Sequence, residues 1–181
     1  MKFGLLRHAK VLFAKHLFST GNSYNDFIED YEHAEVENLN FKIPIQEFPI
    51  CFVSSLPRAI KTAEMVYEGS FTITDELREV DNKSIYYKNV ITPTLLRSAA
   101  QRIGWYLNSS KVAETRHESN RRADDLLKKL LLTSHNNTLL ITHGLFMHCL
   151  MRALKEKGFE GKRIYIPKNA TLYVFENKKL K

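Results

Sequence analysis

Short apolar segments alternate with amphipathic segments along most of this chain, and the alternation restricts the folds that it can adopt. Four apolar runs have the length and composition of buried strands, and they cover residues 1–8, 49–55, 71–77 and 137–144. Runs with helical periodicity lie between and after them, at about 23–35, 56–69, 92–107, 115–132 and 145–158. Two further strands are expected near the end, at 163–167 and 170–176. Strands that alternate with helices are typical of parallel sheets covered on both faces. We therefore expect the α/β class, with a three-layer α/β/α sandwich around a mostly parallel central sheet.

Capping residues mark the expected helix boundaries. Ser23, Ser55 and Thr92 each precede a helical run and are expected to cap it. Thr115 and Glu118 form the Thr-x-x-Glu pattern of a capping box. Within the helix at 92–107, one apolar stripe is expected to face the core, and it consists of Leu96, Ala99, Ile103 and Tyr106.

Composition indicates one domain in a reducing compartment. The chain has 181 residues, of which 44% are hydrophobic, so a single domain over residues 1–181 has enough apolar material for its own core. Cys51 and Cys149 both lie in apolar runs, which favours buried free thiols over a disulfide framework. No apolar stretch approaches the roughly 20 residues of a membrane span, and charged residues interrupt the first apolar run too early for a signal peptide. We expect a cytoplasmic protein without a membrane partner.

The formal net charge of +7 is compatible with several anionic partners, namely nucleic acid, a membrane surface or a small substrate. The basic run "RRADDLLKK" at 121–129 alternates with acidic residues and fits the solvated face of an amphipathic helix, and no aromatic RNA-binding motif is present. His143 and His148 are five residues apart and do not share a helical face, and the chain has no His-Glu-x-x-His motif. These observations argue against a nucleic-acid binder and against a metal enzyme.

Unusual polar residues stand at the ends of three expected strands. Arg7 and His8 end the first strand, serines at 54–55 end the second with Arg58 in the helix that follows, and His143 ends the fourth. Parallel strands bring these ends to one edge of the sheet, where ligands bind in folds of this kind. Arginine side chains and helix N-termini both favour tetrahedral oxyanions. The arrangement predicts a pocket for a phosphoryl group.

The same motifs resemble those of the histidine phosphatase superfamily, which has the phosphoglycerate-mutase-like fold. The resemblance rests on Arg-His after the first strand, on "SLPRAIKTA" at 55–63, and on a late strand that ends in His-Gly. It extends from Leu5 to about Glu176. It implies a small single-domain member of the superfamily that acts on a small phosphorylated substrate.

The resemblance also implies a role for each motif residue. His8 takes the position of the nucleophile, which forms a phosphohistidine intermediate that water hydrolyses. Arg7, Arg58 and a protonated His143 take the positions that bind the phosphate and stabilise its charge in the transition state. Because these cations supply the electrostatic stabilisation, we expect a phosphatase that needs neither a metal nor a cofactor.

Members of the superfamily also use a carboxyl group that protonates the leaving oxygen, usually in a Leu-x-Glu segment after the third strand. Glu79 occupies this position in "ELREVD". Glu76 and Asp81 are close enough in sequence to compete, so the donor is one of these three residues, with Glu79 favoured.

The first motif departs from that of the mutase-type members. Ala9 stands where they have glycine, Val11 where they have a hydroxyl residue and Ala14 where asparagine is expected, and the later "STGN" at 19–22 could supply the missing contacts. These losses favour a phosphatase over a mutase. They also leave two alternatives, a non-catalytic member that binds phosphoesters or a protein, and a phosphatase of protein phosphohistidine. The walls of the substrate pocket are expected in the loop after His8 and in the segment 80–120, with its aromatic residues Tyr86, Tyr87 and Trp105.

Overall fold

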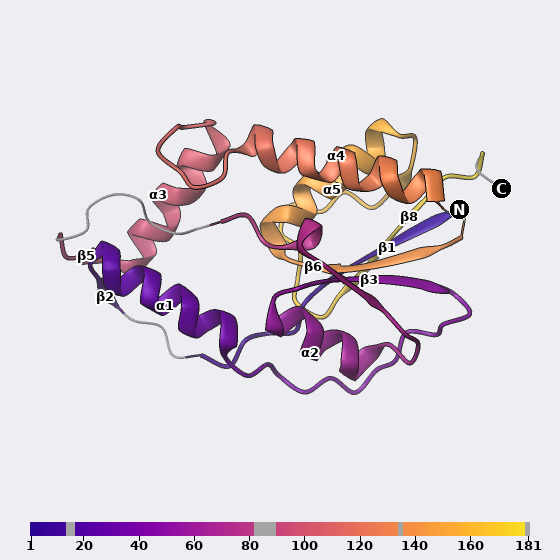
Figure 1. The fold of residues 1–181 in the computed structure, drawn as a ribbon, viewed down its shortest axis with the longest axis horizontal. Coiled ribbons are helices and arrows are strands. Elements are labelled where there is room, and N and C mark those ends of the chain that lie inside the picture. Colours follow the sequence, from indigo (N-terminus) through magenta and orange to yellow (C-terminus); the bar gives the residue numbers. More distant parts are fainter. Residues whose placement is uncertain (14–16, 82–89, 134–135, 180–181) are drawn as a thin grey trace.

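A computed structural model describes residues 1–13, 17–81, 90–133 and 136–179 (Figure 1). Within these residues, a central sheet has six strands in the order β4-β3-β6-β1-β8-β7. The strands are β1 (Lys2–Arg7), β3 (Ile50–Ser54), β4 (Thr72–Thr74), β6 (Thr138–Thr142), β7 (Glu160–Gly161) and β8 (Leu172–Glu176). The pairs β1–β6, β3–β6 and β3–β4 are parallel, whereas β8 is antiparallel to β1 and to β7. The predicted mostly parallel sheet is confirmed.

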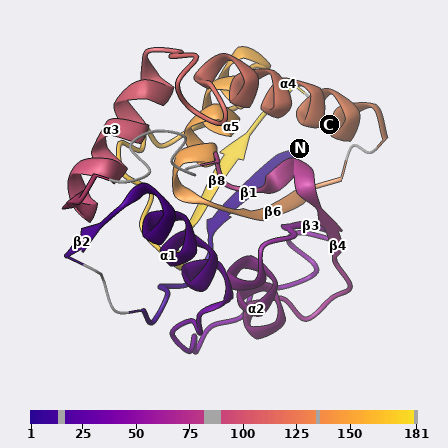
Figure 2. The same cartoon turned by 60° about the vertical axis from the view of Figure 1, so that its left-hand side comes forward.

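Helices cover both faces of this sheet. The helices in the described residues are α1 (Gly21–His33), α2 (Pro57–Val66), α3 (Thr94–Tyr106), α4 (Arg116–Thr133) and α5 (Gly144–Glu156), and those that cover the two faces are α2, α4 and α5. Alternate residues of β1 point to opposite faces, so that Leu5 belongs to the core under α4 and α5, and Leu6 belongs to the core under α2. Figures 1 and 2 show α4 and α5 on one side of the sheet and α2 on the other. The predicted three-layer α/β/α sandwich is therefore confirmed.

The remaining elements lie beyond the carboxyl ends of the parallel strands. There α1 and α3 flank a short second sheet that pairs β2 (Phe18–Ser19) with β5 (Thr92–Pro93) (Figure 1). Arg97 of α3 donates a hydrogen bond to the carbonyl of Ser19, and Tyr24 of α1 bonds to Ser98 of α3. This second layer of structure therefore stands over the edge of the sheet where the strands end.

Several expected helix starts differ from the structure. Thr20 caps α1 in place of Ser23, because the two residues form a reciprocal capping box in which each side chain accepts a backbone N–H of the other. Ser55 does not cap α2, because its hydroxyl is bonded to the carboxylate of Asp75. Thr92 pairs with β2 as a strand residue, and so it does not cap α3.

Two other expectations about the sheet and the core are wrong. Residues 163–167 form no strand, and the carbonyl of Pro167 accepts a hydrogen bond from Arg7. The predicted stripe of α3 is exposed, with Leu96, Ile103 and Tyr106 each about three-fifths accessible. The helix instead buries Thr94, Arg97 and Trp105, because it packs on β5 and beside α4 and not on the central sheet. Periodicity located this helix but did not indicate which face it buries.

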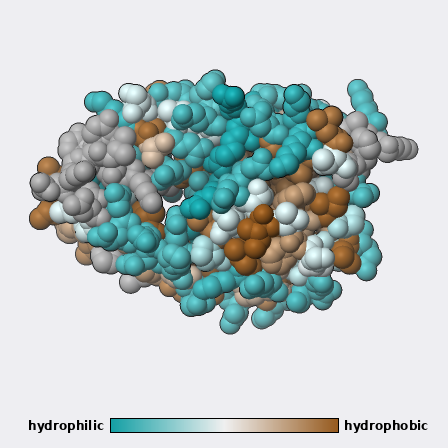
Figure 3. Space-filling view, in the orientation of Figure 1, coloured by the Kyte–Doolittle hydropathy of each residue, from teal (hydrophilic) through white to brown (hydrophobic). Residues whose placement is uncertain are grey.

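The amphipathic character of α4 is confirmed. The helix buries Ala123, Leu126, Leu127 and Leu130 against α5 and the sheet, and its outward face is hydrophilic (Figure 3). Cys51 and Cys149 are buried free thiols, also as expected. No helix in the described part of the chain combines the length and the apolar character that crossing a membrane requires.

The capping box at the start of α4 can be tested by removing one of its side chains. The carboxylate of Glu118 accepts from the backbone N–H of Thr115 at 2.8 Å, and the Thr115 hydroxyl accepts from the N–H of Glu118 at 3.3 Å. We expect Thr115→Ala to lower the free energy of unfolding by about 1 kcal/mol, measured by urea denaturation. The exposed neighbour Ser110 is the matched control, and a similar loss in Ser110→Ala would contradict this role for Thr115.

The loss of unfolding free energy in Thr115→Ala should also depend on pH. Hydrogen bonds from Thr115 lower the pKa of Glu118 from its ordinary value. The stabilisation is present above the ordinary pKa and is lost as the pH falls through the lowered one. The difference between wild type and Thr115→Ala should therefore shrink in acid.

Candidate functional site

The ends of β1 and β6 bring two histidines into contact. The last residue pair of the two strands is Arg7 with Thr142, and the next N–H, that of His8, donates to the carbonyl of Thr142 at 3.0 Å. The ring centroids of His8 and His143 are 5.0 Å apart, and both rings are buried. Arg58, in the first turn of α2, is buried as well, and its positive charge lowers the pKa values of both histidines. Three of the predicted site residues therefore lie together.

Among the described residues, one ring nitrogen of His8 forms a hydrogen bond and the other is available for chemistry. Its Nδ1 lies 2.6 Å from the carbonyl oxygen of Ala9. Because a carbonyl only accepts, Nδ1 carries the proton in this contact and Nε2 keeps its lone pair. Burial, and then the positive charge of Arg58, lower the pKa of His8 to about 3. His8 is therefore a neutral imidazole at physiological pH.

His143 has a different arrangement of its two nitrogens. Its Nε2 lies 2.7 Å from the hydroxyl of Ser54, which also accepts the N–H of Leu56 at 3.3 Å. Its Nδ1 is buried and has no hydrogen-bond partner among the described residues. Burial, followed by the charge of Arg58 and by His8, holds the pKa of His143 well below its ordinary value. The expected protonated His143 is therefore neutral in this environment, and a nearby dianion would be needed to raise its pKa.

Both arginines present unpaired N–H groups. Nη1 of Arg7 donates to the carbonyl of Pro167 at 2.7 Å, but Nε is buried without a partner in the described part of the chain. Nε and Nη1 of Arg58 are buried without partners there too, and the guanidinium lies 5.3 Å from the ring centroid of Tyr31. A Cβ at Gly144 would lie only 3.1 Å from Cζ and Nε of Arg7, so glycine is what lets this guanidinium lie against the first turn of α5. Buried, unpaired cationic donors are costly and indicate a site for an anion.

Residues without charge hold the backbone of the first motif in place. Thr62 accepts the N–H of Ala9 at 2.9 Å and donates to the carbonyl of Arg58 at 2.6 Å, so it joins the first motif to the second. From the loop before β8, Asn169 donates to the carbonyl of His8 at 2.8 Å. Ala9 is fully buried and does not have a positive φ, so this backbone accepts alanine at a position where glycine was expected from the resemblance.

The three candidate acids lie in different environments. The carboxylate of Glu79 accepts the N–H groups of Leu145 at 3.2 Å and Phe146 at 2.9 Å, at the N-terminus of α5. Burial lowers the pKa of Arg58, and the negative charge of Glu79 partly opposes this shift, so the carboxylate acts on a phosphate-binding candidate. Glu76 is instead paired with Lys129 on α4, at 3.3 Å. Asp81 is exposed.

Sequence reasoning did not select three residues that contact this site. Ser54 was identified only as a strand end, whereas Tyr31 and Asn169 lie outside every motif. The expected contribution of 19–22 is not seen at Ser19 and Thr20, which bond to α3 and α1. Ala14, Tyr86 and Tyr87 lie outside the described residues. Trp105 is buried and donates to the hydroxyl of Ser119 at 3.0 Å. No cluster of three or more potential metal ligands occurs in the ranges that the structure describes.

Comparison with known proteins gives a consistent picture. The sequence model of the histidine phosphatase superfamily (branch 1) matches residues 5–179. No curated protein sequence matches. Among solved structures, "Mycobacterial hydrolase 2" is similar with a TM-score of 0.59 at 14% identity, over 96% of this chain and 80% of that one. A mycobacterial glucosyl-3-phosphoglycerate phosphatase has a TM-score of 0.58 at 13% identity, over 96% of this chain and 88% of that one. A phosphoserine phosphatase from Entamoeba histolytica, in complex with 3-phosphoglyceric acid, has a TM-score of 0.57 at 14% identity, over 99% and 98%.

The low pKa of His8 makes the fold sensitive to acid. Histidine in an unfolded chain has a pKa near 6.5, so between that pH and about 3 the unfolded state binds a proton that the folded state does not. The contribution of the neutral His8 to the free energy of unfolding is therefore fully present above pH 6.5 and decreases as the pH falls below that value. We expect the unfolding free energy, measured with urea in phosphate-free buffer, to fall less between pH 7 and pH 5 in His8→Asn than in wild type. Equal losses in the two proteins would contradict the low pKa.

Proposed function

The chain belongs to branch 1 of the histidine phosphatase superfamily, and we propose that it is a phosphatase that hydrolyses phosphomonoesters through a phosphohistidine on His8. One observation carries the proposal: the neutral, buried ring of His8 lies 5.0 Å from that of His143 and feels the charges of Arg58 and Arg7, and all three of these residues have buried nitrogen atoms without partners among the described residues. A nucleophile beside unpaired cationic donors is what phosphoryl transfer requires of a protein. The names of the structural neighbours, which include phosphatases of phosphoserine and glucosyl-3-phosphoglycerate, support a small phosphorylated substrate.

In the first step, the lone pair on Nε2 of His8 attacks phosphorus, and the bond between phosphorus and the ester oxygen breaks. The ring becomes cationic because Nδ1 keeps its proton, and the carbonyl of Ala9 at 2.6 Å stabilises that charge. In the second step, water attacks phosphorus and gives a proton to the carboxylate that protonated the leaving oxygen, while the bond between phosphorus and Nε2 breaks, phosphate leaves, and Nε2 regains its lone pair. The same contact with Ala9 therefore orients the nucleophile and stabilises the intermediate.

The charge that develops on the phosphoryl oxygens would be stabilised by side chains. Arg7 and Arg58 supply N–H groups that have no other partner in the described residues. If the Ser54 hydroxyl donates to Nε2 of His143, the remaining proton lies on Nδ1, the nitrogen without a partner, and can be donated to phosphate. These donors need no metal, so hydrolysis should persist in EDTA and should be inhibited by vanadate, which mimics the trigonal transition state.

Trapping the intermediate tests this function. After rapid mixing with labelled aryl phosphate, a phosphoryl group that is labile in acid and stable in base should be found on His8. His8→Asn should reduce kcat by about 10⁴-fold or more, as loss of the nucleophile does in other covalent enzymes. His33→Asn is the control, because His33 is exposed at the end of α1, and it should keep wild-type activity. Label on another residue would contradict the mechanism. Phosphate binding without any turnover would indicate the non-catalytic alternative.

Glu79 is the proposed proton donor to the leaving oxygen. An alkyl leaving group needs this proton, whereas nitrophenolate hardly does. We therefore expect Glu79→Gln to slow the hydrolysis of alkyl phosphates by about 10²- to 10⁴-fold and to have much less effect on nitrophenyl phosphate. Glu76→Gln is the matched control, since that carboxylate is paired with Lys129. If Glu76→Gln or Asp81→Asn separates the two substrates and Glu79→Gln does not, the assignment of the acid is wrong.

A further inference from the structure

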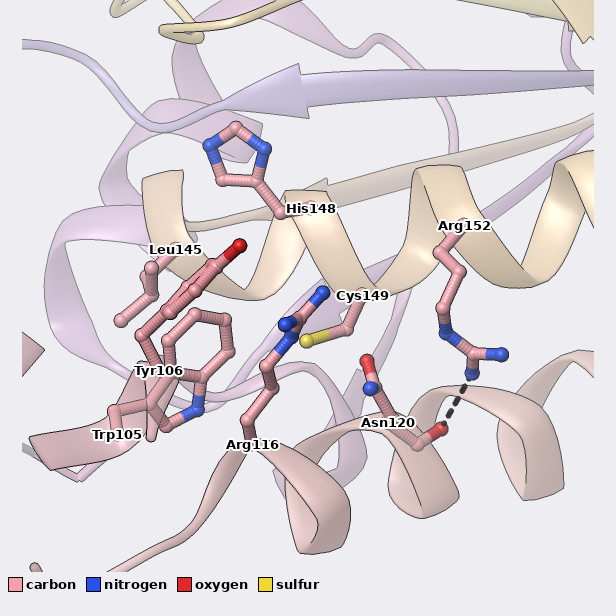
Figure 4. A pocket seen from close by; sticks show the side chains of 8 residues that line it. All are labelled: Trp105, Tyr106, Arg116, Asn120, Leu145, His148, Cys149 and Arg152. Carbon is pink, nitrogen blue, oxygen red and sulfur yellow. Dashed lines mark hydrogen bonds between the residues drawn. The ribbon is translucent and has the colours of Figure 1, made fainter. Parts of the chain in front are cut away.

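A cavity of about 280 Å³ lies between the end of α3, the N-terminal part of α4 and the first three turns of α5 (Figure 4). Its lining residues are Trp105, Tyr106, Arg116, Asn120, Leu145, His148, Cys149 and Arg152. The volume equals that of about nine water molecules in the liquid, which is room for one ring or a short branched chain. The walls combine aromatic and aliphatic surface with a few polar groups, as in sites for small organic ligands.

Arg116 is the cation of this cavity whose charge is not neutralised. Its guanidinium lies 4.6 Å from the ring centroid of Tyr106 and 5.9 Å from that of Trp105. In the part of the chain that the structure describes, it forms no ion pair with a carboxylate. A guanidinium that lies over an aromatic face keeps the N–H groups at its edge available to an acceptor. Figure 4 shows this side chain extending from α4 toward α5.

The other ionisable groups in the lining leave the positive charge of Arg116 in place. Arg152 is already paired with Asp124 at 2.6 Å and with Glu156 at 2.5 Å. Burial lowers the pKa of His148, so this ring is neutral at physiological pH. The described residues of the lining include no aspartate or glutamate. The cavity is therefore apolar in its walls and positive at one point.

The cavity adjoins the proposed catalytic site through α5. The side chain of Leu145 lines the cavity, while its backbone N–H donates to the carboxylate of Glu79 at 3.2 Å. The charge of Glu79 also acts on His148, which lies on the same helix and lines the same cavity. A leaving group that receives a proton from Glu79 is therefore released next to this cavity.

We propose that this cavity binds the leaving group of the substrate, and that it selects a ring or short chain that carries a carboxylate, which pairs with Arg116. The inference rests on the proposed phosphatase activity and specifies its substrate class, a phosphomonoester of a hydroxy acid with an apolar body. Trp105 and Tyr106 provide the flat surface for that body.

Two isosteric esters test the selection. 3-Carboxyphenyl phosphate and 3-carbamoylphenyl phosphate have the same shape and differ in the charge opposite Arg116. We expect wild type to prefer the carboxylate by about 10-fold in kcat/KM, the size expected for one charge-assisted hydrogen bond. Arg116→Met should reduce this ratio to near one, and Arg116→Lys should retain part of it. Arg121→Met is the control, because Arg121 lies on the outer face of α4 with its side chain 79% exposed, and the wild-type ratio should persist in it.

A binding measurement separates failure of this inference from failure of the proposed function. Trp105 is the single tryptophan of the chain and lines the cavity, so its fluorescence reports ligand binding directly. Benzoate should bind about 10-fold more tightly than benzamide, and Arg116→Met should remove the difference. If neither ester is hydrolysed while benzoate is preferred, the catalytic proposal fails and the carboxylate site stands. Equal affinities for benzoate and benzamide, or a preference that persists in Arg116→Met, would overturn the inference.

Discussion

The parallel pairing of β1 with β6 is the constraint on which the site depends. Because Arg7 is the register partner of Thr142, the next residue on each strand is a histidine, and the two rings lie 5.0 Å apart. β3 pairs with the other edge of β6, and this brings Ser54 within 2.7 Å of the ring of His143. A shift of one residue in either pairing would point these side chains to the opposite faces of the sheet. The buried apolar residues that fix the register are therefore part of the catalytic design, although they take no part in the proposed chemistry.

The site also depends on arginine side chains that are buried and have N–H groups without partners among the described residues. Burial lowers the pKa of Arg58, and no carboxylate among the described residues forms an ion pair with this buried guanidinium. The backbone of the arginine is held by Thr62, which also binds the N–H of Ala9, and its guanidinium lies over Tyr31. The unfavourable burial of these groups is offset by apolar packing elsewhere. The burial of these cations also explains why His8 is neutral, because burial and the positive charges of the arginines lower the pKa of its ring.

Local signals in the sequence were enough to locate the strands, most of the helices and the residues at the strand ends, because each depends on short-range periodicity or on a motif. With the assumption of parallel strands, they also predicted that His8 and Arg58 lie close together at one edge of the sheet. They did not predict which face of α3 is buried, because that face depends on which element packs against the helix. Ile103, which was expected to face the core, is exposed. They also could not identify Tyr31 and Asn169, which reach the site from distant segments and belong to no local pattern. Contacts between segments far apart in the chain are set by tertiary packing, which one sequence does not encode in any short stretch.

The N-terminus of α5 has a different use from the one that the motif suggested. Helix N-termini were expected to donate their N–H groups to phosphate, but those of Leu145 and Phe146 are bonded to Glu79. In the proposed mechanism, the negative charge of the phosphoryl group is therefore stabilised mainly by side-chain donors. The positions of these side chains depend on α2 and on the loop before β8. The helix instead holds the carboxylate, whose charge acts on Arg58, through the N–H of Leu145, a residue whose side chain lines the cavity. In the proposed mechanism, an acid held at that position serves a leaving group that lies beside α5, so the hydrogen bonds that orient Glu79 would also set where the rest of the substrate lies.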